Sequence, residues 1–325
     1  MLACKEPATR EARGDVGIVL PTTHATVATP DADVNRAQTA LAEGRPTLAT
    51  RIVMPVLRTP ERRTPEAQLV AARAAAAWEG WHLVNAILAF EPWLSTRFNG
   101  EGLKLLARAS LERDQATKAR EYGEAALRVH AEPAARGVRM VLLARALDRL
   151  DAVDSAATMY RRAADALPMI REWLFLRAAG TTRDPKVRQR LYSGVRDTVS
   201  RLRIPYTEAQ ALERFRMDVA AAAAYEALGD IPSSYRLRLS SGYDAAQRSG
   251  LRVGLLGYIQ REARGEALQR ALEVLDAAFP RLDSVSQLLV SRRAAEAGVP
   301  ARAAAGFSRL RGSMLTDEDV ITWAR

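Results

Sequence analysis

The chain has 325 residues, of which 48% are hydrophobic and 6% aromatic, and its 48 basic and 38 acidic residues give a formal net charge of +10. This length and apolar content allow either two ordinary domains or one elongated repeat array. A single cysteine excludes an intramolecular disulfide, and three scattered histidines leave no spacing typical of a metal site, so no metal or cofactor is expected. No stretch approaches the roughly 18 continuous apolar residues that a membrane-spanning helix needs.

The positive charge is carried almost entirely by arginine and is spread along the chain. Such a charge favours anionic partners, although the base composition of a genome can also produce an arginine bias beside so much alanine. The densest basic segment, residues 183–203, lacks the interleaved aromatic residues of a base-stacking surface. Nucleic acid is therefore not an expected partner.

Residues 1–29 are predicted to form a flexible tether, because threonines and prolines interrupt their apolar segment "VGIVLPTTHATVATP". Cys4 ends the sequence "MLAC", which resembles the last part of the lipobox of bacterial lipoproteins, where the cysteine is acylated. The basic and apolar segments that precede a lipobox are missing. Two interpretations stay open: a lipidation site at Cys4 with its signal upstream of Met1, or a free thiol on a cytosolic terminus. Membrane contact is expected only through such a lipid anchor.

Two segments further along superimpose without a gap. Residues 106–127 read "LARASLERDQATKAREYGEAAL", and residues 143–164 read "LARALDRLDAVDSAATMYRRAA". Each begins Leu-Ala-Arg-Ala, passes through a polar turn to an alanine (Ala119, Ala156), and ends with a tyrosine and an alanine pair. The period of 37 residues accommodates two antiparallel helices, and alanine has the highest helix propensity. The sequence therefore predicts an all-α fold.

This pattern resembles the tetratricopeptide repeat, a helix-turn-helix unit of about 34 residues. Its small residues at the contact of helices A and B are matched by Ala107, Ala119, Ala144 and Ala156, and Pro168 stands where the family often ends helix B. Asp114 and Asp151 stand in place of the family's turn glycine, and its tryptophan is missing. The resemblance implies a right-handed α-solenoid.

Looser copies extend the repeat, each with a turn residue followed five positions later by a small residue that we call the anchor. These copies place anchors at Ala49 after Gly44, at Ala303 after Gly298, near Ala86 and near Ala221. The 65 residues between Ala156 and Ala221 fit two units, and prolines at 60, 92, 133, 168, 205 and 280 mark the ends of helix pairs. Residues 30–325 are thus predicted to form one right-handed α-solenoid of tetratricopeptide-like repeats.

One surface is a candidate binding site. In the tetratricopeptide family helix A lines the concave groove, and the residue after its small alanine points into that groove. The positions that match are Arg108, Arg145 and Arg325, with Lys104 and Arg149 one helical turn away. Such a row could bind carboxylates of a protein or peptide partner through paired N–H donors. The alternative is a solvated arginine face.

No catalytic motif stands out in the chain. His24, His82 and His130 have no acidic or nucleophilic partner at a recognisable spacing. The segment "GLRVGLLG", residues 250–257, lacks the lysine of a phosphate-binding loop and the strand of a dinucleotide site, so close helix packing explains its glycines. The final residues "DEDVITWAR" align with the start of a helix A, so we expect the chain to be an incomplete product.

The helical pairs, including "WLFLRAAG", "TEAQALERF" and "AAAYEALGD", resemble the N-terminal superhelix of bacterial soluble lytic transglycosylases. In those enzymes a lysozyme-like domain with a catalytic glutamate in a Glu-Ser context follows the superhelix, and this chain contains no Glu-Ser pair. The resemblance implies a non-catalytic superhelix in the cell envelope or periplasm that binds peptidoglycan or another anionic polymer. The alternative is a stand-alone tetratricopeptide adaptor, in the envelope or the cytoplasm, that binds proteins in its concave groove.

Overall fold

The computed structural model describes residues 31–324, and all regular structure in this part of the chain is helical. The predicted all-α class is therefore confirmed for these residues. The helices in the first half are α1 (Ala32–Ala42), α2 (Pro46–Arg58), α3 (Pro65–Ala77), α4 (Trp81–Leu88), α5 (Glu101–Glu112), α6 (Ala116–Arg128), α7 (Pro133–Arg149), α8 (Val153–Ala166) and α9 (Arg171–Thr181). Those that follow are α10 (Pro185–Ser193), α11 (Thr198–Arg201), α12 (Ile204–Arg214), α13 (Asp218–Ala227), α14 (Ile231–Ser240), α15 (Ala245–Arg261), α16 (Gly265–Ala278), α17 (Ser284–Glu296), α18 (Pro300–Phe307) and α19 (Asp317–Ala324).

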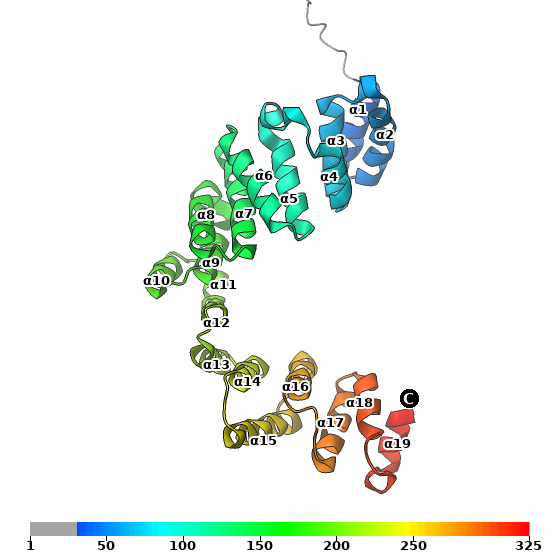
Figure 1. The fold of residues 1–325 in the computed structure, drawn as a ribbon, viewed down its shortest axis with the longest axis vertical. Helices are drawn as coiled ribbons and strands as arrows, with labels where there is room; N and C mark the ends of the chain where they lie inside the picture. The colour runs from blue at the N-terminus through cyan, green and yellow to red at the C-terminus, as the bar shows by residue number, and fades with distance from the viewer. Residues whose placement is uncertain (1–30, 325) are drawn as a thin grey trace, which may run out of the picture.

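The helices pack mainly on their neighbours in the sequence, and together they form an arc that is open on one side (Figure 1). Alternate helices α1, α3, α5 and α7 also pack on one another in order. In Figure 1, α5 and α7 lie on the inner side of the arc, whereas α6, α8 and α10 lie on its outer side. Beyond the middle of the chain the inner side is lined by α16 and α18.

One kind of turn joins consecutive helices seven times within residues 31–324. Its central residue has a φ between 56° and 76° and is Gly44, Glu79, Asp114, Asp151, Arg216, Gly229 or Gly298. The backbone N–H of the next residue donates to the carbonyl five positions earlier, at 2.8–2.9 Å. This is the Schellman arrangement, which satisfies carbonyls that a helix end would otherwise leave without a donor. Asp114 and Asp151 thus occupy the left-handed position that glycine would favour.

The residue five positions after each turn is buried against the preceding helix. These anchors are Ala49, Val84, Ala119, Ala156, Ala221, Ser234 and Ala303, none more than 2% exposed. The predicted anchors Ala49, Ala119, Ala156, Ala221 and Ala303 are confirmed as buried positions. The anchor expected near Ala86 is Val84, because the turn lies at Glu79, and Ala86 itself is exposed. Small side chains at these positions let the two helices approach closely.

The apolar core follows the arc as a series of clusters. A large cluster extends from Val34 in α1 to Ala126 in α6, and a second from Met140 to Val195. A third joins α14 to α18 and includes Leu255, Leu272 and Phe307. The cluster between the second and third, in α12–α14, has five buried members, of which three are alanines. Each part of the arc is therefore held mainly by local packing.

The chain between Ala156 and Ala221, predicted to hold two units, includes α9 and α10, which pack on each other. The short helix α11 and the extra helix α14 were not predicted. Pro60, Pro92 and Pro168 each start a short 3₁₀ segment between helix pairs, and Pro133 starts α7, positions where the missing proline N–H costs no hydrogen bond. None of the helices within residues 31–324 combines the length and the apolar character needed to cross a membrane.

Candidate functional site

The predicted basic row lies on the inner helices α5 and α7, and its members on α5 already have partners. The Nζ atom of Lys104 lies 3.5 Å from a carboxylate oxygen of Glu101. The guanidinium of the exposed Arg108 lies over the ring of Trp81, 5.0 Å from the ring centre, in a cation–π contact. Both cations thus contribute to contacts within their own repeat or with the one before it.

The two members on α7 contact the preceding repeat. Arg145 lies 3.5 Å from the carboxylate of Glu112. Arg149 donates to the backbone carbonyl of Leu111 and lies 3.4 Å from the carboxylate of Asp114. These pairs are partly exposed, and such pairs contribute at most about 1 kcal/mol, so a carboxylate ligand could still compete for them. Ligand binding by this row stays a prediction, and Arg325 and Cys4 lie outside the described residues.

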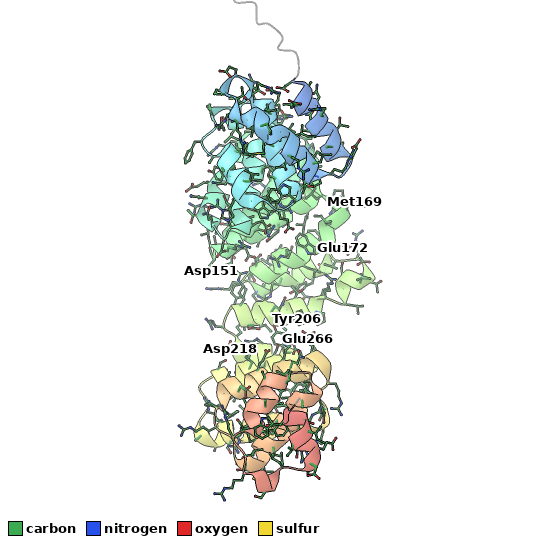
Figure 2. All side chains as sticks on the ribbon, turned by 90° about the vertical axis from the view of Figure 1, so that its right-hand side faces the viewer. Asp151, Met169, Glu172, Tyr206, Asp218 and Glu266 are labelled. Atoms are coloured by element: carbon green, nitrogen blue, oxygen red, sulfur yellow. The ribbon has the colours of Figure 1, made fainter. Side chains whose placement is uncertain are left out.

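Further along the inner face, a hollow of about 520 Å³ lies between α9 and α12, and we call it the α9–α12 groove. Its lining residues are Asp148, Trp173, Leu176, Arg177, Gly180, Thr181, Leu202, Arg203, Tyr206, Thr207, Gln210 and Arg214. Figure 2 views the molecule from the open side of the arc and shows Tyr206 near the middle of this face, with Met169 and Glu172 above it towards one edge. Tyr206, a lining residue of the groove, therefore lies on the side that faces the inside of the arc.

Helix α9 forms one wall because its two faces differ. Trp173, Arg177 and Gly180 recur at helical spacing on the face that lines the groove, and Trp173 is 41% exposed. The opposite face carries Leu174 and Ala178, which are fully buried in the second core cluster. Burial of that face fixes the rotation of α9 and directs Trp173 and Arg177 into the groove.

Helix α12 and the residues before it form the other wall. Arg203, Tyr206, Thr207, Gln210 and Arg214 share one face of the helix and line the groove. The ring of Tyr206 packs edge-on against Tyr225 of α13, with 5.8 Å between ring centres, while 44% of Tyr206 remains exposed. This contact limits the rotation of the Tyr206 ring where it lines the groove.

Asp148, the acidic residue of α7, joins the two walls through ion pairs. Its carboxylate accepts from Arg177 of α9 at 3.3 Å and from Arg214 of α12, and its own side chain is only 15% exposed. Below Arg177, the ring of the buried Tyr160 lies 5.8 Å from the guanidinium carbon. Burial raises the pKa of the Tyr160 hydroxyl, so the phenol stays neutral and adds no negative charge there.

Charge in the groove is predominantly positive. Three guanidiniums, those of Arg177, Arg203 and Arg214, line the groove with one carboxylate, that of Asp148, and a second carboxylate, that of Asp151, lies 3.4 Å from Arg214. Two of the three already pair with the carboxylate of Asp148. Arg203 is exposed and has no ion-pair partner within residues 31–324, so it is the cation available to a ligand.

Several large apolar side chains in this part of the chain remain uncovered. Leu202, which lines the groove, is 76% exposed, and Met169, Ile170 and Val199, in the segments just before α9 and α12, are also exposed. Exposed groups of large apolar residues commonly mark sites of interaction. The combination of apolar walls and one free cation is what the groove offers chemically.

Only part of this site could be found from the sequence. Helical spacing alone puts Trp173 with Arg177, and Tyr206 with Gln210, on single faces. The two faces meet because α9 packs directly on α12, although α10 and α11 lie between them in the sequence. No periodicity within one helix signals that contact.

The other candidate residues do not assemble into a reactive centre. His82 is exposed at the start of α4 and His130 is exposed after α6, while His24 lies outside the described residues. Residues 31–324 contain no group of three or more histidine, cysteine, aspartate or glutamate side chains placed to hold a metal ion. Close packing explains Gly254, which faces the Tyr235 hydroxyl, but not Gly250, which faces open space.

Comparison with known proteins gives no relative for this chain: no protein-family model matches it, and no curated protein is significantly similar to it.

Proposed function

We propose that this protein is a helical-repeat scaffold that binds a partner protein on the inner face of its arc, with the α9–α12 groove as the principal contact. The observation that carries the proposal is the groove itself, where Trp173, Leu202 and Tyr206 stay exposed beside the free cation Arg203. An exposed apolar surface of this kind is costly for a chain that acts alone, because it favours association.

The finer architecture belongs to the same proposal: a right-handed α-solenoid of tetratricopeptide-like repeats. It is supported by the shared turn at Asp114 and Asp151 and by the alanine anchors that follow each. It is also supported by the packing of α3, α5 and α7 on one another in order. Scaffolds of this architecture present long concave surfaces for binding.

Site-specific photo-cross-linking tests the scaffold function. A photoreactive amino acid is placed at Tyr206 in the groove and, as a control, at Arg190 on the outer helix α10. We expect a defined polypeptide to cross-link from position 206 and not from position 190. After identification, the purified partner should bind the wild type and bind Tyr206→Ala much more weakly. Equal cross-linking from both positions, or full binding by Tyr206→Ala, contradicts the proposal.

A second candidate is the non-catalytic superhelix of an envelope protein, as in a peptidoglycan lytic transglycosylase. The net charge of +10 favours it, because wall polymers are anionic. Co-sedimentation of the full chain with purified sacculi tests it, and failure to sediment at moderate salt would count against it. Acylation of Cys4 belongs to this candidate and is tested by incorporation of a labelled fatty acid, which Cys4→Ser should abolish.

A further inference from the structure

We infer that the α9–α12 groove takes an acidic peptide segment that carries a large apolar side chain. The inference rests on the proposed function, because it gives the chemical class of the partner segment bound at that same site. The occupant is part of a protein, and the recognition elements are the apolar walls, the cation Arg203 and the amide of Gln210.

The walls require an apolar side chain. Trp173 stands on α9 and Tyr206 on α12, so an aromatic or large aliphatic side chain that enters the groove contacts both walls at once. The volume of about 520 Å³ falls within the range of roughly 300–1,000 Å³ that is usual for ligand sites. Leu202, which lines the groove and is 76% exposed, offers the ligand a further apolar contact.

The charges require an anion beside that side chain. Arg177 and Arg214 are both tied to Asp148, so a ligand carboxylate that approached them would compete with a bond already made. Arg203 has no such bond, and a carboxylate can accept two parallel N–H bonds from its guanidinium. A basic segment is disfavoured, since Arg203 would repel it and the carboxylates of Asp148 and Asp151 are already paired with Arg177 and Arg214.

The remaining polar groups suit a peptide backbone. Gln210 is exposed, and no hydrogen bond engages its side-chain amide within residues 31–324, so it offers one acceptor and two N–H donors to a peptide bond. The hydroxyl of Thr207 donates to the carbonyl of Arg203 at 2.9 Å and keeps lone pairs free to accept. A backbone N–H of the ligand therefore finds an acceptor on the α12 wall.

A single-stranded nucleic acid fits these observations less well. Its phosphates need a succession of available cations along the strand, whereas Arg177 and Arg214 already pair with Asp148 and Asp151. Trp173 and Tyr206 are rings on which bases could stack, but Leu202, the most exposed of the three exposed apolar residues that line the groove, offers no ring. The groove therefore favours an apolar side chain next to a carboxylate.

Peptide display identifies the ligand class directly. A library of random short peptides is selected against the full chain, and enriched peptides are measured by fluorescence anisotropy. We expect selected sequences to combine aspartate or glutamate with tryptophan, phenylalanine or leucine. Arg203→Glu should weaken their binding roughly tenfold or more, as loss of a charge-assisted hydrogen bond does. Arg190→Glu, which makes the same charge change on α10, should leave binding unchanged.

A charge-swap completes the test. Peptides whose acidic residue is replaced by lysine should bind Arg203→Glu more tightly than they bind the wild type. Because Arg203 is exposed and has no side-chain partner within residues 31–324, its variants should keep the helical circular dichroism of the wild type. Selection of basic or uncharged peptides, equal binding by the two glutamate variants, or tighter groove binding by a mixed-sequence oligonucleotide would overturn the inference. Cross-linking from Tyr206 would still succeed in that case, so failure of the ligand class and failure of the scaffold function are distinguishable.

Discussion

The helices before α9 and those after α11 share the same turn, but they carry it at different spacings. In the first region the turn residues are Gly44, Glu79, Asp114 and Asp151, spaced by 35, 35 and 37 residues. In the second region the turns at Arg216 and Gly229 join three consecutive helices, and the next such turn is at Gly298. The second region therefore contains an odd helix, α14, that the first region lacks.

This odd helix has a structural consequence. In the first region α5 and α7, the first helices of their pairs, lie on the inner side of the arc, whereas in the second region α16 and α18, the second helices, lie there (Figure 1). Regular spacing lets each helix pair cover the apolar face of the one before it. Where the spacing changes, between α9 and α12, Trp173, Leu202 and Tyr206 remain uncovered. The comparison indicates that the candidate site arises where the regular spacing of the turns is interrupted.

The largest expected effect on stability comes from shortening a buried leucine in one apolar cluster of each region. Leu106→Ala in the large first cluster and Leu237→Ala in the small α12–α14 cluster should each lower the free energy of unfolding by about 3 kcal/mol, since both side chains are buried. Hydrogen exchange should then separate them. We expect Leu106→Ala to reduce protection across the whole first cluster and Leu237→Ala to reduce it only in α12–α14. The same loss of protection in both variants would contradict the division into two regions.

Two arginines, the buried Arg139 and the partly buried Arg293, test whether helix ends are stabilised in the same way in both regions. Arg139 donates to the carbonyls of Ala126 and Val129 at the end of α6, at 2.6 and 2.9 Å, and burial lowers its pKa. Arg293 donates to the carbonyls of Ile259 and Ala263 at the end of α15. Replacing either by leucine leaves these carbonyls without that donor and should cost about 2–3 kcal/mol.

The matched control is Arg136→Leu on α7, one turn before Arg139, because Arg136 is exposed and makes no hydrogen bond through its side chain within residues 31–324. Urea denaturation should show little change for this variant. If Arg293→Leu lowered the free energy of unfolding no more than the control does, the stability of the second region would not depend on the hydrogen bonds from Arg293 to the end of α15.

The sequence predicts the regular region better than the interrupted one, for a physical reason. A turn residue followed five positions later by alanine reflects the Schellman turn and the close helix crossing, both of which are local. Gly229 also has its buried residue five positions later, but that residue is Ser234, so the pattern of small apolar anchors missed α14.

The candidate site was predicted less well than the fold. The basic row at Arg108 and Arg145 lies on α5 and α7 and stays a prediction as a binding site, and the sequence could not show that Arg145 meets Glu112 of α5. The groove depends on the packing of α9 on α12. Trp173 of α9 and Tyr206 of α12 are far apart in the sequence, because α10 and α11 lie between the two helices. Contacts between repeats require the three-dimensional arrangement.

A smaller effect is expected at the turns. Glu79 in the first region and Arg216 in the second have φ values of 64° and 60°, a conformation that costs less for glycine. Glu79→Gly and Arg216→Gly should each raise the free energy of unfolding by about 0.5–1 kcal/mol, net of the extra freedom that glycine gives the unfolded chain. Gly229→Ala, the reverse change at the same kind of turn, should lower it, and thermal denaturation measures all three. A loss of stability in both glycine variants would mean that the left-handed turn does not limit stability.

The smallest effect concerns the two ends of the described chain, each held by an arginine on an aspartate. Arg62 donates from Nε to Asp31 at 2.7 Å beside α1, and Arg292 donates from Nε to Asp319 at 2.8 Å within α19. The hydrogen bonds from Arg62 hold the pKa of Asp31 at about 2, below its ordinary value of 3.8. Those from Arg292 hold the pKa of Asp319 lower still.

Because the pKa of Asp31 is lowered in the folded protein, its contribution to stability is complete above about pH 4 and is lost as the pH falls towards 2. Over that interval α1 should loosen while α19 stays attached, since Asp319 remains ionised. An NMR titration of the aspartate carboxyl carbons and of the amide signals of both helices measures this order. Arg62→Gln should raise the pKa of Asp31 towards its ordinary value and leave α19 unaffected. The amide signals of α1 and α19 could instead change with the same midpoint pH. In that case acid would destabilise the whole arc, and the ends of the two regions would not respond independently.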